Sequence, residues 1–116
     1  MTAQADAFLG RVVEVTIDRP LGSRHPRWGF VYPVNYGYLP GVIGGDGEPL
    51  DAYVLGVREP VRGFRGRCIA VVHRLDDDDD KLVVVPEGVS LNDEEIHARV
   101  RFQERYFQSV IWRSEV

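Results

Sequence analysis

Short runs of β-branched and apolar residues, each ended by turn-forming or acidic residues, constrain the fold of this chain most. They cover residues 11–17, 50–57, 66–73 and 81–85. Valine, isoleucine and aromatic side chains favour strands, whereas glycine, proline and aspartate end them. Strands of this length and spacing are typical of a small barrel or sandwich. The sequence therefore predicts a mainly β protein.

One helix is predicted near the C-terminus, from about Asp93 to about Val110. Asn92 can cap it and Glu95 can complete a capping box, with acidic residues in the first turn. Steps of three or four residues place one largely apolar face on this helix: Ile96, Val100, Gln103, Phe107 and Val110. We expect this face to cover the sheet. The predicted fold class is α+β, mainly β: a small OB-like five-stranded β-barrel with one C-terminal helix packed against it.

The length of 116 residues predicts a single domain over 1–116, in which residues 1–9 are loosely ordered because they lack strong periodicity. The net charge of −4 argues against a nucleic-acid partner, which normally requires a basic stripe. No apolar run approaches a membrane span and no signal-peptide pattern occurs. The lone Cys68 is expected to be a buried, inert thiol. We therefore expect a cytoplasmic protein without membrane partners.

A short acidic segment is the first candidate for chemistry. Three carboxylates, Asp46, Glu48 and Asp51, lie around Gly47 and Pro49, which bend the backbone and can bring side chains together. Convergent carboxylates repel each other unless a cation lies between them. Mg²⁺ prefers one or two carboxylates together with waters and substrate phosphates. The segment predicts a phosphate-processing site, although a plain Asp-Gly hairpin turn accounts for it equally well.

Five consecutive aspartates, residues 76–80, precede Lys81 and a predicted strand, which places them at a hairpin tip or strand mouth. Such a run is either solvated or shares a divalent ion, because adjacent like charges repel. Four acids fall at EF-hand spacing: Asp76, Asp78, Asp80 and Glu87. Lys81 occupies the position where that loop needs glycine, and strands rather than helices flank it. An EF-hand is therefore not expected.

The segment Tyr-Pro-Val-Asn-Tyr-Gly-Tyr at 32–38, followed by 46–51, resembles in order and spacing the core of the family I soluble inorganic pyrophosphatases. The second motif of that family reads Asp, small, Asp, Pro, apolar, Asp, and here Glu48 replaces its middle Asp. The resemblance extends from about Arg11 to Tyr106, in a chain shorter than ordinary members. It implies hydrolysis of inorganic pyrophosphate to two phosphates by metal-activated water, two or more Mg²⁺ ions and a homo-oligomer.

The same resemblance implies a set of site residues. Its metal ligands are carboxylates: Glu14, Asp46, Asp51, Asp76 and Asp79. The register within 76–80 stays open. Its catalytic residues are Glu48, which accepts a proton from water, and Tyr36, which orients a carboxylate or phosphate. Its phosphate-binding residues are Arg24, Lys81 and Tyr106. Glu48 lengthens the arm of the base by one methylene, and Phe107 stands where the family carries a phosphate-contacting lysine.

Other functions remain open at this stage. The changed base and the missing lysine also suit a hydrolase of another small phosphoanhydride, such as a nucleotide. A different class is a non-catalytic barrel that binds divalent cations or pyrophosphate without turnover. A third is an oligonucleotide-binding barrel, since small barrels bind single strands through aromatic residues over a basic groove. The acidic net charge argues against that third function.

Overall fold

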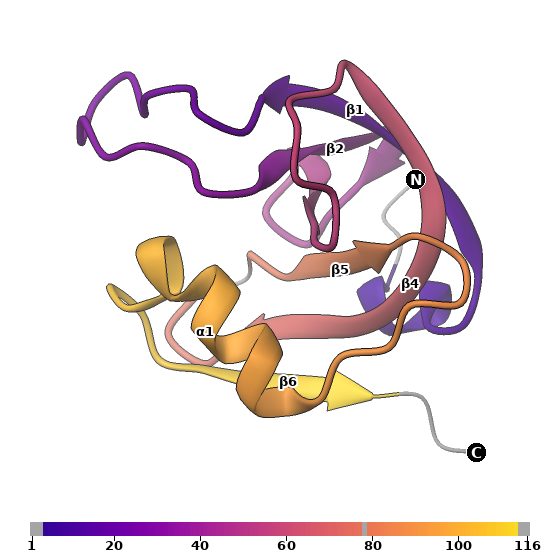
Figure 1. Ribbon diagram of the computed structural model, residues 1–116. Helices are drawn as coiled ribbons and strands as arrows, with labels where there is room; N and C mark the ends of the chain where they lie inside the picture. Colours follow the sequence, from indigo (N-terminus) through magenta and orange to yellow (C-terminus); the bar gives the residue numbers. More distant parts are fainter. Residues whose placement is uncertain (1–3, 78, 114–116) are drawn as a thin grey trace.

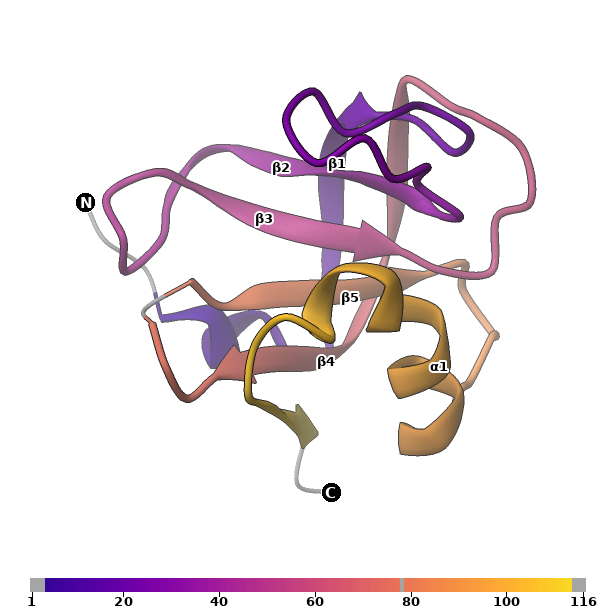
Figure 2. The same ribbon diagram turned by 90° about the vertical axis from the view of Figure 1, so that its left-hand side faces the viewer.

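This computed structural model describes residues 4–77 and 79–113. Within them the chain forms six strands, one α-helix and one short 3-10 helix, joined by loops (Figures 1 and 2). Asp78 and residues 1–3 of the predicted loose segment lie outside the described part. In chain order the elements are η1 (Ala5–Phe8), β1 (Val12–Arg19), β2 (Asn35–Ile43), β3 (Pro49–Val54), β4 (Gly63–Arg74), β5 (Lys81–Val85), α1 (Asp93–Glu104) and β6 (Ser109–Arg113).

Five strands close into a barrel. The strand order is β1-β2-β3-β5-β4-β6, and β1 also pairs with β4, so β6 is added outside the closed ring. The β3–β5 pair is parallel, whereas the other pairs are antiparallel. The predicted five-stranded barrel is confirmed. Each of the four predicted runs contains a strand, but β2 and β6 had not been assigned as strands from the sequence.

Two residues of the 32–38 motif, Gly37 and Asn35, have structural roles in the barrel. A Cβ at Gly37 would lie 1.8 Å from the backbone oxygen of Thr16, so β1 can approach β2 only over a glycine. Asn35 is fully buried. Its Oδ1 accepts from the backbone N–H groups of Leu21 and Val61, and its Nδ2 donates to the backbone carbonyl of Glu59. Asn35 therefore joins the loop between β1 and β2 to the loop between β3 and β4.

Helix α1 begins as predicted. Asn92 Oδ1 accepts from the Glu95 N–H at 2.8 Å and Glu95 Oε1 accepts from the Asn92 N–H at 3.0 Å, which completes the capping box. Ile96 and Val100 are buried in the core beneath the helix. The predicted end near Val110 is wrong, because the helix ends at Glu104. Residues 109–113 instead gain a full backbone ladder along β4 as strand β6.

The N-terminal segment contacts the barrel. Ala5 of η1 is buried in one of the two core clusters, and the Gly10 N–H donates to the Cys68 carbonyl at 2.8 Å. The Cys68 thiol is buried and free, as expected. Burial raises its pKa to about 11. Within the described residues, no helix is long and apolar enough to cross a membrane.

Candidate active site

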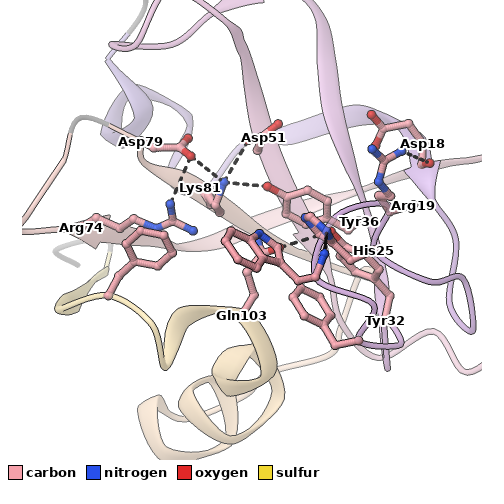
Figure 3. Close-up of a pocket in the computed structure, with 13 residues that line it drawn as sticks. Asp18, Arg19, His25, Tyr32, Tyr36, Asp51, Arg74, Asp79, Lys81 and Gln103 are labelled. Carbon is pink, nitrogen blue, oxygen red and sulfur yellow. Dashed lines mark hydrogen bonds and ion pairs between the residues drawn. The ribbon is translucent and has the colours of Figure 1, made fainter.

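The parallel β3–β5 pair positions the site. Asp51, the third residue of β3, lies opposite Lys81, the first residue of β5. The turn that precedes β3 and the acidic loop that precedes β5 consequently lie at the same end of the barrel (Figure 2). A pocket of about 360 Å³ opens beside Asp51, Asp79 and Lys81 (Figure 3). It is lined by Asp18, Arg19, His25, Trp28, Phe30, Tyr32, Tyr36, Asp51, Arg74, Asp79, Lys81, Gln103 and Phe107.

Lys81 ties together the acidic side of the pocket. Its Nζ donates to Asp51 Oδ2 at 2.9 Å, to Asp79 Oδ2 at 3.0 Å and to the Tyr36 hydroxyl at 2.6 Å (Figure 3). Burial raises the pKa of the Asp79 carboxyl, against the opposing charge of Lys81. Burial, followed by the charges of Asp51 and Asp79, holds the pKa of Tyr36 well above its usual value. Tyr36 is therefore a neutral hydroxyl between charged groups.

Arg74, at the end of β4, had not been identified from the sequence. Its Nε and Nη2 donate to the two oxygens of Glu104, each at 2.9 Å, and its Nη1 donates to Asp79 Oδ2 at 3.3 Å. Its guanidinium carbon lies 3.6 Å from the centre of the Phe107 ring. Arg74 follows Ala70 and Val72 on the face of β4 that packs beneath helix α1. A charged residue at that apolar position was the signal available in the sequence.

Buried hydrogen bonds support Glu104 from the helix side. The Tyr53 hydroxyl donates to Glu104 Oε2 at 2.5 Å and accepts from Gln103 Nε2 at 2.8 Å. Gln103 Oε1 in turn accepts from the Tyr32 hydroxyl at 3.2 Å. Burial and the Glu104 charge keep the pKa of Tyr53 well above its usual value, so this hydroxyl stays a donor. The helix end and the pocket floor thus form one polar network.

Aromatic side chains from the loop between β1 and β2 line the mouth of the pocket. Trp28 is 68% exposed there. The His25 ring lies 4.9 Å from Phe30 and 6.2 Å from Tyr32, centre to centre. His25 Nδ1 also accepts from the Trp28 backbone N–H at 3.0 Å. Partial burial, then Arg19, lowers the pKa of His25, which favours the neutral ring.

Four predicted site residues meet in the pocket: Tyr36, Asp51, Asp79 and Lys81. Asp46 and Glu48 lie in the exposed turn between β2 and β3, where Asp46 Oδ1 accepts from the Glu48 N–H at 3.0 Å. They do not line the pocket. Asp76 Oδ2 accepts from the Gln108 N–H at 3.3 Å, also outside the lining.

The other three predicted residues lie elsewhere. Glu14 is on β1, exposed and 3.5 Å from Arg65. Arg24 Nη1 donates to the Gly29 carbonyl at 2.9 Å within the β1–β2 loop. Tyr106 follows α1 and is 59% exposed. None of the three is among the residues that line the pocket.

The pocket fits a divalent cation in part. Asp51 and Asp79 offer hard oxygen donors, but the oxygens that converge, Oδ2 of each, are both bonded to Lys81 Nζ. An ion would bind their other oxygens, and Mg²⁺ needs only one or two carboxylates when waters and substrate oxygens complete its shell. In the described part of the chain, no group of three or more histidine, cysteine, aspartate or glutamate residues could hold a metal ion. The donor set therefore suits one ion shared with a ligand.

The pocket of this closed barrel combines carboxylates, buried cations and neutral tyrosine hydroxyls. Residues 14–110 match the family model of the inorganic pyrophosphatases. The chain therefore belongs to the inorganic pyrophosphatase family, which confirms the resemblance found in its motifs.

Individual relatives match over shorter segments. The inorganic pyrophosphatase of Pseudomonas aeruginosa is 39% identical over 59 residues, 47% of this chain and 34% of that protein. The inorganic pyrophosphatase of Caulobacter vibrioides is 33% identical over 85 residues, 66% of this chain and 48% of that protein. The matched segments thus span a third to a half of these relatives.

Solved structures share the fold. An inorganic pyrophosphatase from Ehrlichia chaffeensis superposes with a TM-score of 0.67 at 23% identity, over 84% of this chain and 82% of that one. The Thermus thermophilus inorganic pyrophosphatase gives 0.65 at 19% identity, over 98% and 87%. The barrel and its covering helix are accordingly the fold of this family.

Proposed function

We propose that this chain hydrolyses inorganic pyrophosphate to two phosphates with bound Mg²⁺. The observation that carries the proposal is the convergence of Asp51 and Asp79 on Lys81 Nζ, in a member of the inorganic pyrophosphatase family. Parallel pairing of β3 with β5 supports it, because it fixes Asp51 opposite Lys81, and the loop that carries Asp79 leads directly into β5.

Five of the pocket residues have a part in this proposal. Asp51 and Asp79 would hold Mg²⁺, and Lys81 and Arg19 would donate to phosphate oxygens. The neutral Tyr36 hydroxyl orients Asp51 or a phosphate oxygen through Lys81. Bound Mg²⁺ would supply neutralisation of the phosphate charge and activation of the attacking water.

Proton acceptance from the attacking water is proposed for Glu48. Glu48 precedes Asp51 by three residues and lies in the exposed turn between β2 and β3. The resemblance implies further ligands for two or more ions, namely Glu14, Asp46 and Asp76. Because these three lie outside the pocket lining, the converging pair supports one ion.

Phosphate release tests the proposal. We expect Mg²⁺-dependent turnover of pyrophosphate by the wild type and a loss of roughly 100-fold or more in Asp51→Asn, because misplacing one catalytic group costs about that much. Turnover by Glu48→Gln should also be slower, because the proposal assigns proton acceptance to Glu48. Asp6→Asn, an exposed acid on η1, is the matched control and should retain wild-type rates. Equal rates in all four proteins would contradict the assigned site.

A second candidate is the hydrolysis of a phosphoanhydride that carries an aromatic base, such as a nucleoside diphosphate. The exposed Trp28 and the His25 and Phe30 rings at the pocket mouth favour it, since inorganic pyrophosphate offers nothing to stack on them. Trp28→Ala should then slow nucleoside diphosphate turnover and spare pyrophosphate turnover. Trp112→Ala on β6 is the control. A wild type that prefers the nucleotide strongly would replace the first proposal.

The non-catalytic alternative is favoured by one observation, the position of Glu48 outside the pocket lining. Under it, calorimetry would show Mg²⁺-dependent pyrophosphate binding while no phosphate forms over a long incubation. Phosphate release at a rate that falls in Asp51→Asn would exclude this alternative.

The remaining properties are proposed as well. A homo-oligomer is supported by exposed apolar side chains along the β4–β6 pair, Leu75, Val110 and Trp112. A cytoplasmic location is supported by the free, buried Cys68, since reducing compartments keep thiols unpaired. We propose that residues 1–116 form one domain, supported by the barrel that spans most of them.

A further inference from the structure

Strand register places Arg74 against Asp79. Strands β4 and β5 are antiparallel, with Val72 opposite Lys81. The same register carried two residues further sets residue 74 opposite residue 79, at the point where the acidic loop begins. Figure 3 shows the consequence: Arg74 and Lys81 approach Asp79 from two different strands. Asp79 Oδ2 accepts from both, at 3.3 Å and 3.0 Å.

Arg74 is held too firmly to act as a mobile surface charge. It is only 5% exposed, Glu104 takes two of its donors, and the Phe107 ring covers its face. Glu104 is itself buried and fixed by Tyr53. The guanidinium edge that remains, Nη1, points to the acidic loop. A planar arginine clamped in this way presents a fixed positive charge to whatever binds beside it.

The acids of the pocket are already balanced by cations of the chain. The lining contains three carboxylates and three cations, namely Asp18, Asp51 and Asp79 with Arg19, Arg74 and Lys81. Arg74 is also paired with Glu104, which lies outside the lining. The described members of the acidic run are also engaged by protein groups, through Arg74, Lys81, His73 and the Gln108 N–H. A second divalent ion beside Asp79 would therefore meet a guanidinium at contact distance, with strong repulsion.

We propose that Arg74, clamped by Glu104, is a built-in counter-cation that supplies beside Asp79 the charge a second divalent ion would otherwise bring. The pocket then binds a pyrophosphate-like anion with at most one Mg²⁺. This inference rests on the proposed function for the identity of the anion. Arg74 acts as a positioning residue for Asp79 and as a donor toward the phosphate oxygens.

A charge-neutral double variant tests it. Arg74→Met with Glu104→Gln removes the cation without leaving a buried unpaired carboxylate, which would itself unfold the protein. The probe is imidodiphosphate, a pyrophosphate analogue in which an N–H group replaces the bridging oxygen, so that it resists hydrolysis. We expect calorimetry to find more Mg²⁺ bound per chain in the double variant than in the wild type. Equal stoichiometry in two folded proteins would overturn the proposal.

Arg67→Met with Glu87→Gln is the matched control. It removes another arginine–glutamate pair that also involves β4, but that pair is exposed and remote from the pocket lining. Its Mg²⁺ stoichiometry should equal that of the wild type.

A measurement on the wild type alone covers the case in which the double variant fails to fold. The dependence of imidodiphosphate affinity on Mg²⁺ concentration gives the number of ions taken up on binding, by linkage. A logarithmic slope of about one or less supports the proposal, and about two or more overturns it. Absence of imidodiphosphate binding by the folded wild type also overturns it. Absence of phosphate release from pyrophosphate contradicts the proposed function but leaves this slope measurable.

Discussion

At the scale of single residues, Tyr53 joins the helix to the pocket. It is fully buried, and its hydroxyl bonds both Glu104 and Gln103. We expect Tyr53→Phe to lower the free energy of unfolding by about 1–3 kcal/mol, because the buried Glu104 carboxylate loses a donor. Urea denaturation measures this change. Tyr106→Phe, at a 59% exposed tyrosine, should stay within about 0.5 kcal/mol of the wild type. Equal effects would show that the Tyr53 hydroxyl contributes nothing to stability.

Cys68 predicts a pH dependence of stability. Burial raises its pKa from 9.0 to about 11 in the folded chain, so the folded state keeps the thiol proton that the unfolded state loses. The contribution is therefore fully present below about pH 9 and is lost between about pH 9 and pH 11, with a total of about 3 kcal/mol.

Urea denaturation of the wild type and of Cys68→Ala across this range isolates the thiol from the tyrosines, which titrate in both proteins. The unfolding free energy of the wild type should fall relative to that of Cys68→Ala as the pH rises. A difference that stays constant from pH 8 to pH 11 would contradict the shifted pKa.

At the scale of elements, the contact between β1 and β2 depends on Gly37. An added Cβ would overlap the Thr16 carbonyl at 1.8 Å, and backbone cannot move aside cheaply within a closed barrel. We expect Gly37→Ala to destabilise the chain by about 3 kcal/mol or more, measured by thermal unfolding. Gly63→Ala is the control, because its Cβ would meet the Val15 carbonyl at an ordinary 3.5 Å. Similar losses at both glycines would exclude steric overlap as the cause.

The two ends of α1 differ in how far the sequence could predict them. The beginning depends on neighbours in the chain, the Asn92 and Glu95 capping box, and was predicted correctly. The end depends on a partner far away, because Val110 pairs with His73 of β4. Local apolar spacing could not distinguish a longer helix from a short helix followed by a strand. Strand β2 was missed for a related reason, since Gly37 weakens the strand pattern and is explained only by the close approach of β1.

At the scale of the whole molecule, β6 lies at one end of the strand order and pairs with β4 within the described residues. Val110 is 37% and Trp112 36% exposed on this strand. Apolar side chains on an edge strand favour association with another chain. We therefore expect a homo-oligomer whose mass, measured by light scattering, falls toward that of one chain in Val110→Lys. Val12→Lys, at an exposed valine on β1, is the control. A wild type that is monomeric at all concentrations would contradict this expectation.

The barrel as a whole also decides which predicted residues can act together. Parallel pairing of β3 with β5 brings Asp51 and Asp79, nearly thirty residues apart, onto one lysine. The same closure leaves Glu14 on the outer surface and Tyr106 beyond the helix. Motif spacing identified the acids and the lysine, but the strand order decides which of them lie in the same pocket.

The sequence by itself determined four of the six strand segments, the capped start of the helix, the buried free thiol and the family, because each depends on neighbouring residues or on motifs of fixed spacing. Only the tertiary structure decided the Arg74–Asp79 contact, the position of Glu48 and the conversion of the last predicted helical turn into β6. Those features depend on register between distant strands. Backbone pairing fixes that register, whereas the side-chain pattern of any one segment does not encode it.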